Sequence, residues 1–140
     1  MRLDALITEI GNCCLKEEIC LHCKREKCLL GFCKKSILTA LKQKDEFITN
    51  GLQEIPYGDT KAYGTAAVIS SLGFLLNQCR NCNLYHDEEC IINIIRSSLE
   101  IILLGEAQEY KGSTLLYVND IKKINPAMAD RILQSIQLRK

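Results

Sequence analysis

The sequence predicts an all-α protein, a single-domain bundle of four to five helices with two cysteine-rich metal-binding loops. Apolar residues recur at helical spacing along much of the chain, and hydrophobic residues make up 47% of it, enough for a real core. No glycine-rich linker divides the 140 residues, so residues 1–140 are expected to form one domain. Nine cysteines gather in two stretches, at about 13–33 and 79–90, which we interpret as the metal-binding loops.

The sequence indicates a cytoplasmic protein with no membrane association. The N-terminus has no long apolar run after Arg2, so a signal peptide is not indicated. The most apolar stretch, from Ile91 to Leu104, is interrupted by polar residues and is too short to span a bilayer. Thiols stay reduced in the cytoplasm, where clustered cysteines indicate metal binding more often than disulfides. In a secreted protein the same cysteines would instead predict a disulfide scaffold.

The first cysteine cluster reads CLHCKREKCLLGFC and contains Cys20, Cys23, Cys28 and Cys33. Two residues between cysteines allow a tight turn to direct both sulfurs at one ion, with backbone N–H groups bonding the sulfurs. The basic insert between the second and third cysteines suits an exposed loop and favours thiolates over thiols. His22 lies inside the turn and is not expected to be a ligand. The sequence therefore predicts four thiolate ligands here.

The second cluster contains Cys79, Cys82, His86 and Cys90 in the pattern Cys-x2-Cys-x3-His-x3-Cys. This pattern resembles the zinc knuckle of nucleocapsid-type proteins, in which the two later gaps are four residues long. The resemblance covers twelve residues, and the aromatic side chain that stacks on a base in that family is not evident here. The resemblance implies a metal site, and the RNA-binding role of the knuckle is not carried over.

The two clusters share an order that leaves the grouping of the ligands open. In both, a Cys-x2-Cys pair and a charged insert precede a cysteine, two large aliphatic residues and a helix, as at Cys28 and Cys90. There could be one ion in each half, or both Cys-x2-Cys turns could converge on one ion. A third arrangement brings Cys13 or Cys14 into either site.

Zinc is the metal that these ligands favour. Four cysteines, or three cysteines and one histidine, form the usual tetrahedral structural zinc site, with no position left for water. An iron–sulfur cluster is the alternative, because it also takes three or four cysteines. No proline follows a cysteine, so the ferredoxin signature is absent.

Helical segments are expected to connect and follow the clusters. A short amphipathic helix is expected over residues 2–11. After the first cluster we predict helices over residues 34–49, from 59 or 60 to about 78, from about 87 to 104, over 106–123 with an interruption at Gly112–Ser113, and from Asn125–Pro126 to the C-terminal end. The helix over 34–49 is expected to place Leu38 and Leu41 on its apolar face and to stop at Asn50–Gly51, and the helix from about 87 is expected to begin with an acidic first turn that contains Cys90.

The helix from 59 or 60 is rich in glycine, alanine and serine, which predicts close approach of a neighbouring helix; a ligand cavity is the alternative. In the helix from about 87, Arg96 and Glu100 are spaced for an i,i+4 ion pair on an exposed polar strip.

Three classes of function are compatible with this pattern. The first is a metal-stabilised helical interaction or regulatory module that binds a protein partner or forms a homodimer. Nucleic acid is an alternative partner for the basic region 16–44, although Phe32 is its only aromatic residue. The second class is an iron–sulfur protein acting in electron transfer or redox sensing. An enzyme is not favoured, because no phosphate-binding loop, HExxH or GxSxG motif occurs and both histidines lie within the cysteine clusters.

Overall fold

The computed structural model describes residues 3–14, 20, 25–59, 63–80 and 89–139. These residues form six α-helices and two short 3-10 helices, and they contain no β-strand. The α-helices are α1 (Leu3–Gly11), α3 (Leu29–Gln43), α4 (Thr65–Arg80), α5 (Ile91–Leu104), α6 (Thr114–Ile124) and α7 (Pro126–Leu138), and the 3-10 helices are η1 (Arg25–Lys27) and η2 (Gly51–Glu54). The predicted all-helical class is confirmed for the described residues, which form six α-helices where four to five were predicted.

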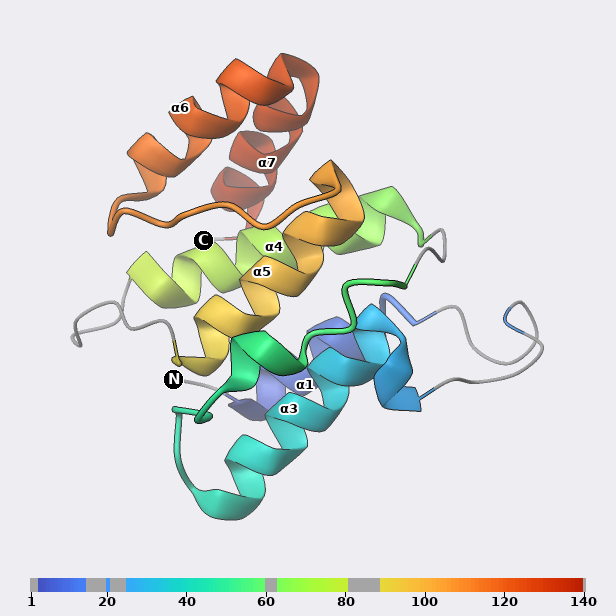
Figure 1. The fold of residues 1–140 in the computed structure, drawn as a ribbon. Coiled ribbons are helices and arrows are strands. Elements are labelled where there is room, and N and C mark those ends of the chain that lie inside the picture. The colour runs from blue at the N-terminus through green and yellow to red at the C-terminus, as the bar shows by residue number, and fades with distance from the viewer. Residues whose placement is uncertain (1–2, 15–19, 21–24, 60–62, 81–88, 140) are drawn as a thin grey trace.

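The helices form three layers (Figure 1). The central layer is α4 and α5; α1 and α3 lie on one side of it, and the hairpin of α6 and α7 lies on the other. The main core is built from the facing apolar sides of all six helices. Asn125 separates the two helices of this hairpin, as predicted, because it ends α6 with its N–H and caps α7 with its side chain, which accepts the N–H of Met128.

Helix α3 begins and ends about five residues earlier than predicted. Cys28 caps its N-terminus, and Lys44 ends it in the left-handed conformation, so the predicted stop at Asn50–Gly51 is wrong. The shift also changes the buried face. Leu38 and Leu41, predicted to face the core, are 55% and 40% exposed. The side chains of α3 that reach the main core are Leu30, Cys33, Ile37 and Ala40.

The small residues of α4 allow α7 to approach closely, as predicted. A Cβ atom added at Gly73 would lie within 3 Å of three atoms of Ser135. The same two helices exchange hydrogen bonds, since the Ser135 hydroxyl donates to the carbonyl of Ile69 (2.9 Å) and the Asn77 amide donates to the carbonyl of Ile136 (3.0 Å). Helix α4 begins at Thr65, later than the predicted start at Asp59 or Thr60.

Helix α5 carries a buried ion pair where an exposed polar strip was predicted. The predicted pairing is confirmed, because Arg96 Nε lies 3.0 Å from Glu100 Oε2. The predicted exposure is wrong, since the two side chains are only 2% and 0% exposed. Tyr117 of α6 donates its hydroxyl to Glu100 at 2.6 Å, and the rings of Tyr110 and Tyr117 lie against the Arg96 guanidinium. Neighbouring elements therefore cover this polar side of α5.

The segment between α5 and α6 is held to α5 by its backbone. The N–H of Gln108 donates to Glu100 Oε1 (2.8 Å), and its carbonyl accepts from Arg96 Nη2 (3.2 Å). This use of the backbone explains why the helix predicted over 106–123 begins only at Thr114, after Ser113 caps it. Arg96 Nη2 also donates to Asn93 Oδ1 (2.8 Å). In the part of the chain that the structure describes, Arg96 Nη1 is the buried side-chain nitrogen or oxygen that has no partner.

Among the described residues, no helix is both long and apolar enough to cross a membrane.

Candidate metal centre

The structure places five of the eight predicted metal ligands. These are Cys20, Cys28, Cys33, Cys79 and Cys90, whereas Cys23, Cys82 and His86 lie outside the described residues. Cys13 and Cys14, the alternative ligands, are also described. No disulfide bond links any two of these seven cysteines.

Cys28 is held at the N-terminus of α3 by two hydrogen bonds to its sulfur. The residue has extended dihedral angles (φ −100°, ψ 146°) and occupies the N-cap position. Its Sγ accepts the N–H of Gly31 at 3.3 Å and lies 2.9 Å from the hydroxyl of Tyr63. A helix N-terminus presents unpaired N–H groups and a positive partial charge, so it is a favourable position for an electron-rich sulfur.

Tyr63 connects this sulfur to a carboxylate. Its hydroxyl donates to Asp59 Oδ2 at 2.6 Å, and the same oxygen accepts the N–H of Leu29 at 2.9 Å. Burial, followed by the hydrogen bonds to Asp59 and Cys28, raises the pKa of Tyr63 well above its usual range. Tyr63 therefore keeps its proton as a donor, and Asp59 ties the first turn of α3 to the segment before α4. Asp59 was predicted as a possible start of the next helix and is used here instead.

Cys33 and Cys13 are buried in the main core near Cys28. Burial is the main cause that raises the pKa of the Cys33 thiol to about 12; a hydrogen bond from Ser98 opposes the rise, and the nearby Cys13 and Cys28 add to it. Cys13 Sγ lies 3.1 Å from the hydroxyl of Ser71, and burial raises its pKa as well. Three thiols from α3 and the end of α1 thus gather in one apolar region.

The second cluster is anchored by different contacts. Cys79 lies in the last turn of α4 and is hydrogen-bonded to Tyr110. Burial is the main cause that raises the pKa of Tyr110, and the bond with Cys79 raises it as well. Cys90 occupies the N-cap position of α5 but makes no side-chain capping bond. Its backbone pairs with Phe47 in an isolated antiparallel bridge. The prediction that Cys90 lies inside an acidic first turn of this helix is wrong, since α5 begins one residue later, at Ile91, and has no acid in its first turn.

The anchors of the two clusters lie on opposite sides of the molecule. In Figure 1 the N-terminal end of α3 is on the right, and the C-terminal end of α4 and the start of α5 are on the left. Within the described residues, no group of three or more cysteine, histidine or acidic side chains is arranged to hold a metal ion. The structure therefore brings Cys13, Cys28 and Cys33 together, and it separates Cys28 from Cys79 and Cys90.

Sequence reasoning missed the side chains that surround the Cys28 sulfur. Tyr63 lies 35 residues after Cys28, and Ser71 lies 58 residues after Cys13, so no local spacing connects either residue to a thiol. Only the Gly31 contact follows a local rule, because a capping side chain accepts the N–H of the third helical residue and Gly31 holds that position after Cys28. No protein family, curated protein or solved structure matches this chain.

Proposed function

We propose that this protein is a helical interaction or regulatory module that is stabilised by structural zinc. In the proposal, Cys20, Cys23, Cys28 and Cys33 bind one ion, and Cys79, Cys82, His86 and Cys90 bind a second. The metal has a folding role, since four protein ligands leave no position for a substrate. The module then acts through a protein partner or a second copy of itself.

The observation that carries the proposal is the environment of the Cys28 sulfur. The Gly31 N–H donates to this sulfur, and the Tyr63 hydroxyl, whose one proton is shared between the sulfur and Asp59 Oδ2, lies 2.9 Å from it. Such outer-shell donors orient a metal-bound thiolate and disperse its charge. A neutral thiol is a weak acceptor and gains little from two donors. The donors are themselves fixed, because Gly31 belongs to α3 and Tyr63 is bonded to Asp59.

The separation of the two clusters supports one ion in each half. Cys28 is anchored at one side of the molecule and Cys79 and Cys90 at the other, which disfavours a single ion shared by the two Cys-x2-Cys turns. Cys13 remains the alternative to Cys33 as fourth ligand of the first site, because both thiols lie near Cys28.

Elemental analysis and a visible spectrum of protein purified without oxygen test the proposal. We expect two zinc ions per chain and no visible colour, and a thermal midpoint that falls when a chelator removes the metal. Iron with acid-labile sulfide would contradict the zinc proposal and support the alternative, an iron–sulfur protein that acts in electron transfer or redox sensing. A chain that carries no metal would contradict both.

A pair of cysteine substitutions assigns the first site. Cys28→Ser should lose one zinc ion per chain and keep the other, because a serine hydroxyl is a poor zinc ligand. Cys14→Ser is the matched control, since Cys14 is partly exposed and stands outside the proposed ligand set. Equal loss of zinc in both variants would contradict the proposed grouping.

A further inference from the structure

One side of α3 faces solvent and combines apolar and basic side chains. Counted at 100° per residue, five residues fall within one third of the helix circumference. Leu38 is 55% exposed and Leu41 is 40% exposed, and the lysines lie around them. We call this surface the α3 outer face; its residues are Lys34, Lys35, Leu38, Leu41 and Lys42.

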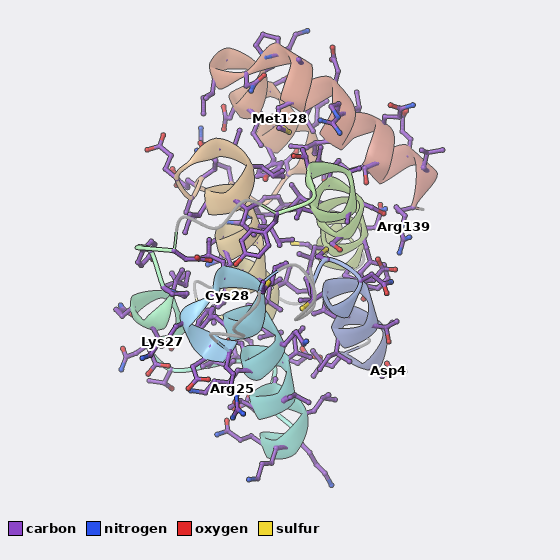
Figure 2. The ribbon with its side chains drawn as sticks, turned by 90° about the vertical axis from the view of Figure 1, so that its right-hand side faces the viewer. Asp4, Arg25, Lys27, Cys28, Met128 and Arg139 are labelled. Atoms are coloured by element: carbon purple, nitrogen blue, oxygen red, sulfur yellow. The ribbon has the colours of Figure 1, made fainter. Side chains whose placement is uncertain are left out.

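The 3-10 turn η1 extends this face at its N-terminal end. A Cβ atom at Gly31, which points to the same side as Leu38, would lie 1.9 Å from the carbonyl oxygen of Arg25. The turn therefore packs directly on the backbone of α3. Arg25 and Lys27 are both exposed, and Figure 2 shows them with Cys28 at the N-terminal end of α3. Two further positive charges thus border the α3 outer face.

Basic residues outnumber acidic residues along the segment that forms this surface. Residues 25–44 contain six basic residues and a single acid, Glu26, although the whole chain carries a net charge of only +1. None of these six basic side chains forms an ion pair in the described part of the chain. Excess charge of one sign raises the local concentration of oppositely charged partners.

We propose that the α3 outer face binds an acidic amphipathic helix of a partner protein. Leucines spaced i,i+3 lie next to each other on a helix surface and provide two apolar anchors for a partner helix. The surrounding lysines match carboxylates on either side of such a helix, as e and g residues do in a coiled coil. The proposal supplies a partner class for the module described above, but it does not depend on the metal.

The chemistry of the face favours an acidic helix over nucleic acid or a lipid surface. It carries no aromatic side chain on which a base could stack. The two leucines at its centre would make no favourable contact with the charged phosphates of a nucleic acid. A helix that lies in a membrane surface needs a wide apolar side with the basic residues at its edges. Here Lys34, Lys35 and Lys42 share the arc with only two leucines.

Fluorescence anisotropy with synthetic probes tests the proposal on the full chain. The main probe is a labelled helical peptide of leucine and glutamate, and its control is the same peptide with glutamine in place of glutamate. A DNA duplex and vesicles of phosphatidylcholine and phosphatidylserine represent the other two classes. We expect the glutamate peptide to bind more tightly than the other three probes.

Two variants separate the apolar and charged contributions. Both Leu38→Ser and the double variant Lys35→Glu/Lys42→Glu should weaken binding of the glutamate peptide by about tenfold or more. The double variant Lys122→Glu/Arg131→Glu makes the same charge change on exposed residues of α6 and α7 and should leave binding within about twofold. Metal content is measured on every variant, so a failure here is distinguishable from a failure of the zinc proposal.

Three results would overturn the proposal. The first is no binding of the glutamate peptide, and the second is tighter binding of the duplex or the vesicles. The third is binding that Leu38→Ser leaves unchanged, because a purely electrostatic surface would not need the leucines.

Discussion

Helices α3 and α5 begin in the same way and then meet different environments. Each follows directly after a cysteine in the N-cap position, Cys28 or Cys90, with extended dihedral angles, and each continues with two buried aliphatic residues. Positions 62 residues apart therefore correspond. Lys34 of α3 corresponds to Arg96 of α5, and Leu38 corresponds to Glu100.

The corresponding side chains are distributed in opposite ways. In α3 the leucine is 55% exposed, and in α5 the arginine and the glutamate are almost completely buried. The difference lies in what packs on the helix, since Gln108 and Tyr117 bond to the polar side of α5 and no such segment covers the α3 outer face in the described part of the chain. Burial of a surface helix is thus decided by its neighbours as much as by its own side chains.

The largest expected effect is the loss of the buried carboxylate. Glu100→Ala should lower the free energy of unfolding by about 3 to 5 kcal/mol, because it leaves the Arg96 guanidinium buried without its countercharge. Leu38→Ala, at the corresponding position of α3, should change it by less than about 0.5 kcal/mol. Urea denaturation measures both. Similar losses in the two variants would show that the two positions are equally buried in solution.

The next effect concerns the contact at the start of α3. Gly31→Ala should destabilise the protein by about 3 kcal/mol, because the added methyl group meets the Arg25 carbonyl, a backbone group that cannot rotate away. Gly11→Ala is the control, since Gly11 is also helical and has no atom within 4 Å of the added Cβ. Thermal unfolding compares them. A stable Gly31→Ala variant would mean that η1 does not pack on α3, and Arg25 would then no longer border the α3 outer face.

The smallest effect is a pH dependence of stability that arises from Glu100 in α5. Burial raises the pKa of Glu100 above its ordinary value of 4.5, against the lowering effects of Arg96, Tyr117 and the Gln108 N–H. The stability that follows from a raised pKa is complete below pH 4.5 and is lost as the pH rises through the raised value.

Comparison with Glu100→Gln isolates this contribution. The wild type should lose stability relative to the variant as the pH rises from below 4.5, with a slope of at most about 1.4 kcal/mol per pH unit. Urea denaturation across this pH range measures the difference. A wild type that instead gains stability relative to the variant as the pH rises would show that the ion pair outweighs burial and lowers the pKa of Glu100.

The helical class and much of the core could be predicted from local patterns. The apolar residues of α5, the capping of α7 by Asn125 and the close approach of a neighbouring helix to the small residues of α4 follow from residue type and spacing. The start of α3 could not be predicted, because it depends on Cys28 acting as a cap, and cysteine is not a usual capping residue. The end of the predicted helix 34–49 failed for a similar reason, since Lys44 adopts a left-handed conformation that glycine normally provides.

The candidate site was predictable only in its sulfur atoms. The two Cys-x2-Cys pairs, Cys20–Cys23 and Cys79–Cys82, and the later cysteines of each cluster, such as Cys28 and Cys90, are selected by spacing alone. The donors around Cys28 were not predictable, since the hydroxyl of Tyr63 reaches the sulfur from 35 residues away. Likewise, the packing of Cys13 beside Cys33 depends on how α1 crosses α3.

The sequence by itself determined the all-helical class, the positions of the cysteines and the apolar side of most helices, because these depend on interactions within a few residues of the chain. The tertiary structure decided which polar residues are buried, which leucines remain exposed and which side chains surround each thiol. These features depend on segments far apart in the chain, such as Gln108 against Glu100 or Asp59 against Leu29. Local periodicity contains no information about such pairs, since they form only when the helices pack.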